Sequence, residues 1–193
     1  MLYFPPRSTT PEGTMKDLLE ILAAMAASKG RMEDPKELIL DMAERVVKSA
    51  TAQFSCKLDE VAILILTSDS KHLRFVAPRK FADLGTIPVT KRDSIAVGVF
   101  GRKVGEAVNN VPMVKHVAFF ESVKLRDRPV PIQKMVTVPI VLAGEAVGVA
   151  QISRKGDNPS EAGPDFTPAD VRRAEQFFAA VAPHLIEARP ERF

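Results

Sequence analysis

Apolar residues recur at helical spacing near the N-terminus of the chain. Intervals of three, four and three residues predict a helix with one apolar stripe. The stripe consists of Met15, Leu18, Leu22 and Met25. A second helix is predicted from Asp34, because an N-cap aspartate precedes a proline at the first helical position. Its apolar positions continue to Phe54 and form a face wide enough to pack on a sheet.

From residue 61 the pattern changes to short runs rich in β-branched residues, which predict strands. The runs 61–66 and 73–77 predict one hairpin, and the runs 134–142 and 146–153 predict a second, longer one. Gly148 in the last run indicates that a neighbour approaches this strand closely. Because consecutive strands are joined by hairpins, we expect an antiparallel sheet and the α+β class.

Two further helices are marked by their start signals. Ser94 is a predicted N-cap for a short helix that ends near Lys103. The last helix opens at Thr167, where an N-cap threonine is followed by Pro168 and, three residues on, by Asp170. Its apolar seam has heptad-like spacing. The seam consists of Val171, Ala174, Phe178, Val181 and Leu185.

Composition and charge are those of an ordinary globular protein. The chain has 193 residues, with 27 basic and 24 acidic side chains scattered along it and a net charge of +3. This scatter disfavours nucleic-acid binding, which calls for a basic stripe. Apolar runs are too short to span a bilayer, and we expect neither a signal peptide nor a membrane segment. Cys56 is the single cysteine, which favours a reducing, cytoplasmic compartment.

The sequence carries no recognisable catalytic or metal-binding constellation. A phosphate-binding loop with Gly-Lys-Ser/Thr is missing, and no nucleophile-elbow motif marks a serine. The histidines at positions 72, 116 and 184 do not have the spacing of metal ligands. We therefore expect no enzymatic activity and no metal site.

Three segments between residues 59 and 185 resemble the GAF domain family. Residues 93–108 are similar to the family's short helix followed by a Gly-x-x-Val strand. Residues 138–149 resemble its "VPI…G…VGV" hairpin, and residues 166–170 resemble the "F-T-x-x-D" that opens its final helix. The resemblance implies a GAF/PAS-like central antiparallel sheet. The terminal helices would cover one face, and a mixed segment would cover a small-molecule pocket on the other.

This resemblance divides the chain into four parts. Residues 1–14 are expected to form a flexible tail, and residues 15–55 the N-terminal helices for dimerisation and sheet packing. Residues 56–188 would form the GAF domain, and residues 189–193 a short tail.

The best-known ligands of the family require residues that have mostly changed here. Cyclic-nucleotide-binding members carry an Asn-Lys…Phe-x-x-x-Asp-Glu signature. The matching positions are Ser153, Arg154, Phe166, Asp170 and Val171. Arg154 and Asp170 keep the basic and acidic pair, which the resemblance implies to be structural. The Asn has become Ser153 and the Glu has become Val171, which disfavours cyclic-nucleotide binding.

Other ligands of the family depend on a cysteine or a histidine. Cys56 precedes the first strand and would not face the pocket, which disfavours bilin attachment. The free-methionine-sulfoxide reductases of the family need more than one cysteine. Haem-binding members use a pocket histidine, and His116 alone keeps that possibility open. The sequence identifies no cofactor.

Residues around the implied pocket come from four regions. Arg102 and Asn109 are the expected polar groups among mostly apolar side chains, and the alternative is that these residues simply fill a core. The expected pocket residues are Phe81, Leu84, Val97, Phe100, Arg102, Asn109, Phe119, Phe120, Met135 and Thr137.

The terminal helices predict a homodimer, since their apolar seams have heptad spacing and the second helix already covers the sheet. The expected dimer residues are Leu18, Leu22, Met25, Phe178 and Val181. We expect a stand-alone sensory or regulatory domain that binds a small molecule and signals in trans to a protein partner. The alternative is a degenerate GAF domain that has no ligand and acts as a protein-interaction or scaffold module.

Overall fold

The computed structural model describes residues 11–31, 34–83, 85–114 and 130–193. Its helices are α1 (Pro11–Ala26), α2 (Pro35–Phe54), α3 (Ile95–Arg102) and α5 (Pro168–Ala188). Its strands are β1 (Val61–Leu66), β2 (His72–Ala77), β3 (Thr86–Pro88), β4 (Glu106–Val108), β5 (Ile132–Leu142) and β6 (Glu145–Lys155). The short 3-10 turns are η1 (Lys29–Arg31), η2 (Leu58–Glu60), η3 (Arg79–Phe81) and η4 (Val111–Met113).

In the described part of the chain, six strands form one sheet in the order β3-β2-β1-β6-β5-β4. Every neighbouring pair is antiparallel. Both predicted hairpins are present, and β5 pairs with β6 along nearly its whole length. The α+β class and the antiparallel sheet are therefore confirmed.

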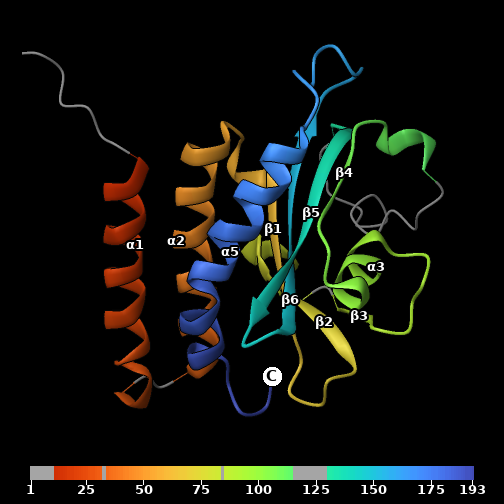
Figure 1. Cartoon of the computed structure of the whole chain (residues 1–193). Helices are drawn as coiled ribbons and strands as arrows, with labels where there is room; N and C mark the ends of the chain where they lie inside the picture. Colours follow the sequence, from red (N-terminus) through yellow and green to blue (C-terminus); the bar gives the residue numbers. More distant parts are fainter. Residues whose placement is uncertain (1–10, 32–33, 84, 115–129) are drawn as a thin grey trace, which may run out of the picture.

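The elements are stacked in layers (Figure 1). Helices α2 and α5 lie side by side on one face of the sheet, α1 packs outside them, and α3 lies on the other face over β5 and β6. The layer between the sheet and α2 and α5 is the helix-side core. Its fully buried side chains include Ile39, Met42, Ile63, Phe177 and Phe178.

Helix ends follow the predicted signals. The Asp34 carboxylate accepts a 2.8 Å hydrogen bond from the Lys36 amide and caps α2. At the start of α5, the Asp170 carboxylate accepts from the Thr167 amide at 2.8 Å, and the Thr167 hydroxyl accepts from the Asp170 amide at 3.3 Å. This reciprocal capping box satisfies two donors that a helix end would leave free.

Two ends of the described chain differ from the expected tails. Helix α1 begins at Pro11, four residues before the predicted start, and a proline fits there because the first helical amides have no intrahelical partner. After α5, the chain returns to the β1–β2 turn. The Arg189 guanidinium donates to the Leu66 carbonyl at 2.9 Å, and the Ser68 amide donates to the Phe193 carbonyl at 3.4 Å.

Gly148 does meet a close neighbour, and that neighbour is the next strand. A Cβ atom at this position would lie 2.4 Å from the Leu64 carbonyl oxygen of β1. Since no ordinary contact is that short, the β1–β6 pairing requires glycine here.

Candidate functional site

The candidate site lies on the face of the sheet that α3 covers. One half of this face is apolar and is called here the α3-side cluster. It consists of Ala62, Leu64, Leu73, Phe75, Phe81, Ile87, Ala96, Val97 and Val149. Phe100 of α3 packs against it and is partly buried. Three of the expected pocket residues, Phe81, Val97 and Phe100, are thus brought together.

The other half of the face carries polar side chains on β5 and β6. Residues alternate between the two faces of a strand, and Val136 and Val138 point into the helix-side core. Met135 and Thr137 therefore point to the α3 side, where they are 4% and 1% exposed. Both expected positions are buried on the expected face.

Gln151 lies opposite Thr137 in the β5–β6 pairing and is 6% exposed. Its side-chain amide donates to the Thr137 hydroxyl oxygen at 3.2 Å. This contact uses one of the two amide donors of Gln151 and leaves the amide oxygen and the Thr137 proton to other partners. The pair places hydrogen-bonding groups beside an apolar cluster.

Two neighbouring polar side chains have structural partners. The Ser153 hydroxyl donates to the Glu60 carbonyl at 3.0 Å, and the Gln133 amide donates to the Gly156 carbonyl at 2.9 Å. These bonds fix η2 and the loop after β6. Gln151 and Thr137 differ from these two residues, because each is the hydrogen-bond partner of the other on this face.

Sequence reasoning missed Gln151, although a signal was present. In the segment 149–153, Val149, Gln151 and Ser153 alternate with two apolar residues that point into the helix-side core. A polar residue at an alternate position of a strand buried on both faces indicates a polar group inside the protein.

The structure places the two expected polar pocket residues differently. Arg102 lies at the rim of the α3 side, where its guanidinium binds the Glu106 carboxylate at 2.8 Å and its side chain is 56% exposed. Asn109 binds the backbone of Phe166 on the helix side. Its amide donates to the Phe166 carbonyl at 3.0 Å, and its oxygen accepts from the Phe166 amide at 2.8 Å. Asn109 is therefore committed to the start of α5.

The predicted pair of Arg154 and Asp170 is not a direct ion pair. The Arg154 guanidinium donates to the Pro164 carbonyl and lies 4.2 Å from the centre of the Phe166 ring. The Asp170 carboxylate binds Arg173 at 3.0 Å besides capping α5. Its bond from the Thr167 amide lowers the pKa of Asp170. Both residues shape the turn before α5, each through its own contacts.

The seams of the terminal helices are buried within the single chain. Leu22, Phe178 and Val181 have no exposed surface, Leu18 is 6% exposed, and Met25 packs against the helix-side core. Helix α1 packs across α2 and α5, which covers its apolar seam within one chain. The homodimer stays a prediction. The expected pocket residues Leu84, Phe119 and Phe120, together with His116, lie outside the described residues.

The single thiol lies on the helix side and is protonated at neutral pH. Cys56 follows α2 and packs against the helix-side core, and burial raises its pKa to about 11, with a smaller effect from Glu60. Within residues 11–31, 34–83, 85–114 and 130–193, no cluster of His, Cys, Asp and Glu side chains could hold a metal ion. Among the helices described, none has the length and apolar character needed to cross a membrane.

Solved structures identify the fold. The GAF domain of the Acinetobacter phosphoenolpyruvate-protein phosphotransferase has a TM-score of 0.65 at 11% identity, over 94% of this chain and 95% of that one. The corresponding GAF domain from Coxiella burnetii has a TM-score of 0.59 at 13% identity, over 91% and 96%. The type II free methionine-R-sulfoxide reductase from Thermoplasma acidophilum has a TM-score of 0.57 at 19% identity, over 80% and 96%.

The chain therefore has a GAF-like fold, as the sequence motifs implied. The fold is shared by the GAF domains of two phosphoenolpyruvate-protein phosphotransferases and by a free methionine-R-sulfoxide reductase. No family model and no curated protein matches the sequence.

Proposed function

Starting from this GAF-like fold, we propose that the chain is a sensory or regulatory domain that binds a small molecule on the α3 side of its sheet. The observation that carries the proposal is the Gln151–Thr137 pair, which is buried next to the α3-side cluster. Small-molecule sites combine an apolar lining with a few placed polar groups, and this face offers both.

The pair also limits the chemistry of the ligand. The Gln151 amide can donate and accept, and the Thr137 hydroxyl can donate, so a ligand with an amide, a carbonyl or a ring nitrogen would match them. Two exposed ion pairs lie at the end of α3, at the rim of the described face: Arg102–Glu106 and Lys103–Glu145. A neutral, partly apolar molecule therefore fits better than a strongly charged one.

A second function is favoured by the packing of the apolar half. Phe75 and Phe81 lie edge to face with their ring centres 5.7 Å apart, and they are 1% and 6% exposed. Side chains packed this closely form a core by themselves. The alternative is thus a GAF-like module without ligand that acts as a scaffold for a partner.

We propose a non-catalytic role in either case. The reductases that share the fold are named for a redox activity. Here the only cysteine has a raised pKa and lies on the opposite face from the candidate site. A thiol with that pKa is a poor nucleophile at neutral pH.

Signalling in trans and dimerisation belong to the proposal as well. A second copy would have to contact the outer face of α1, where Ile21 is 43% exposed, because the apolar seams are buried. The single cysteine is the reason for placing the chain in a reducing, cytoplasmic compartment.

A thermal-shift screen with nucleotides and neutral metabolites tests the proposed function. The screen compares the wild type with Gln151→Leu, and with Gln176→Leu as the matched control, since Gln176 is exposed on α5. We expect a compound that stabilises the wild type and the control but not Gln151→Leu. A screen without any shift, or one in which all three proteins shift equally, would overturn ligand recognition at this pair.

A further inference from the structure

The turn formed by residues 79–83 connects helix α2 to the α3-side cluster. Its backbone is held by two short-range bonds of 2.9 Å, from the Phe81 amide to the Pro78 carbonyl and from the Ala82 amide to the Arg79 carbonyl. A 3-10 turn has three residues per turn, so Arg79 and Phe81 leave it in different directions. The two side chains are thus fixed to one small rigid unit.

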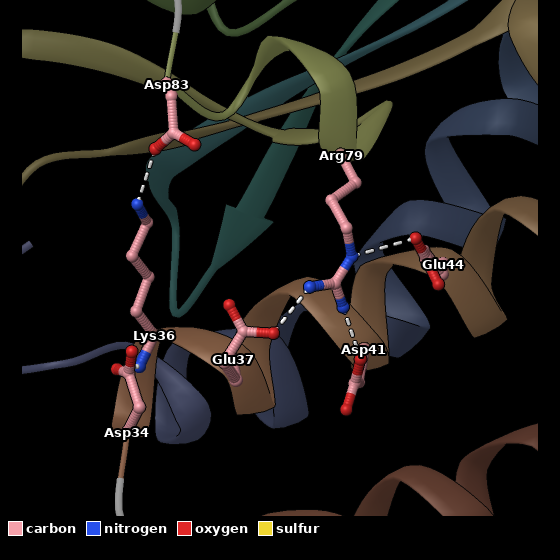
Figure 2. Close-up of polar contacts among 7 residues, drawn as sticks. All are labelled: Asp34, Lys36, Glu37, Asp41, Glu44, Arg79 and Asp83. Atoms are coloured by element: carbon pink, nitrogen blue, oxygen red, sulfur yellow. Dashed lines mark hydrogen bonds and ion pairs between the residues drawn. The ribbon is translucent and has the colours of Figure 1, made fainter.

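On one side of this turn, Arg79 binds three carboxylates of α2 (Figure 2). Its guanidinium contacts Glu37 at 2.5 Å and Glu44 at 3.0 Å, and it also binds Asp41. These three residues are called here the acidic stripe, and they lie on one face of the helix because their spacing is four and three residues. The hydrogen bond to Glu37, foremost, raises the pKa of Arg79.

A second ion pair ties the other end of the turn to the same helix. The Lys36 ammonium donates to the Asp83 carboxylate at 2.7 Å (Figure 2). This bond lowers the pKa of Asp83. The turn is therefore attached to the first three turns of α2 at two points.

On its other side, the same turn carries a wall of the candidate site. Phe81 is 6% exposed, belongs to the α3-side cluster and packs edge to face on Phe75. Ala82 points into the helix-side core, where it is also 6% exposed. Phe81 and Arg79 belong to the same 3-10 turn, so a backbone shift at Phe81 would also move Arg79.

The acidic stripe makes the attachment of residues 79–83 to helix α2 depend on the position of Arg79. Three carboxylates share one guanidinium, and without it they would repel one another along α2. Single exposed ion pairs contribute little, but a guanidinium that serves three carboxylates acts as a network. Helix α2 in turn packs on both α1 and α5.

We propose that residues 79–83 are a coupling element: displacement of Phe81 from the α3-side cluster releases Arg79 and Asp83 from α2, and release from α2 loosens Phe81. Such coupling is reciprocal by thermodynamic necessity. The coupling rests on the proposed function in one respect: the effect of a ligand bound beside Phe81 would be transmitted through residues 79–83 to helix α2.

Hydrogen exchange of the full chain, without any ligand, tests the coupling. Phe81→Ala is compared with Ile87→Ala, which truncates another buried side chain of the same cluster but lies in β3, outside the turn that carries Arg79. We expect roughly three- to tenfold faster exchange in residues 37–44 of α2 for Phe81→Ala only, with β5 and β6 amides as internal reference. If Phe81→Ala does not fold, Phe81→Leu takes its place.

The reciprocal arm removes Arg79. We expect Arg79→Met to speed exchange in residues 79–83. We expect 1 M NaCl to have this effect on the wild type and a smaller one on the variant, which keeps the Lys36–Asp83 ion pair. Arg102→Met is the matched control, since it also removes an exposed ion pair. Equal effects of Phe81→Ala and Ile87→Ala on α2, or unchanged exchange of residues 79–83 in Arg79→Met, would overturn the coupling. Because no ligand is present, that outcome would leave ligand binding untouched.

Discussion

Gln151 of β6 and Thr137 of β5 face each other directly in the sheet, joined by a 3.2 Å hydrogen bond and almost completely buried. Apolar residues of similar shape would pack at this position without any need for partners. A buried polar pair adds little net stability and becomes costly when one partner is lost. Its presence beside an apolar cluster is therefore better explained by recognition than by folding.

A double-mutant cycle tests this interpretation of the pair. We expect Gln151→Leu or Thr137→Val alone to lower the free energy of unfolding by about 1–3 kcal/mol, because each leaves a buried polar partner unsatisfied. The double variant should recover most of this loss or exceed the wild type. Urea denaturation measures all four proteins, and a double variant as unstable as the sum of both single changes would show that the two side chains are not coupled and contradict this interpretation.

Gly148 offers a test of the β1–β6 pairing. We expect Gly148→Ala to destabilise the chain by about 1–3 kcal/mol, because its methyl group would overlap the Leu64 carbonyl and force the strands apart. Gly101→Ala is the control, since Gly101 of α3 has open space around its Cβ position. Alanine is the better helix former, so this control should gain about 0.5–1 kcal/mol. Equal thermal stability of the two variants would contradict the register found here.

Local sequence signals were sufficient for most of the fold. The caps at Asp34 and Thr167 act within three residues, and the strand patterns reflect burial of alternate positions, so both can be predicted from short windows. The place of α1 could not be predicted. Its seam looks the same whether it packs on its own chain or on a second one.

The candidate site was harder to predict because its contacts join distant residues. Asn109 meets Phe166 across 57 positions, and Arg79 meets Glu37 across 42. Neither partner has a local pattern that marks it. The faces of Val97 and Thr137 follow from a helix and a strand that short-range patterns predict. Phe81 lies in a 3-10 turn without such a pattern, and the role of Gln151 depends on which face of β6 is covered.

The thiol of Cys56 should react slowly with alkylating reagents at neutral pH. Burial raises its pKa to about 11, so little thiolate is present at pH 8. We expect the rate of iodoacetamide modification to rise about tenfold per pH unit and to approach its plateau only near pH 11. Mass spectrometry of the intact protein follows the reaction. A plateau near pH 8.5, the value of a free cysteine, would contradict the described environment.

The start of α5 should make stability depend on acid pH. The folded state lowers the pKa of Asp170, so this carboxylate stabilises the fold above its unfolded pKa of about 3.9 and loses that contribution as pH falls further. Thr167→Ala should cost about 1 kcal/mol at neutral pH through the lost cap. The pH dependence is measured by thermal unfolding of the wild type and of Asp170→Asn between pH 7 and 3. The difference in melting temperature between these two proteins should shrink toward low pH. A constant difference would argue against the capping role.

Native mass spectrometry tests most directly whether this chain binds a small molecule at Gln151 and Thr137. The full-length wild type, Gln151→Leu and the surface control Gln176→Leu are incubated with a cell extract filtered to small molecules, and the mass of each intact protein is recorded. We expect one discrete mass increment on the wild type and on Gln176→Leu that is missing from Gln151→Leu. A wild type that gains no mass, or three proteins that gain the same mass to the same extent, would contradict small-molecule binding at Gln151 and Thr137.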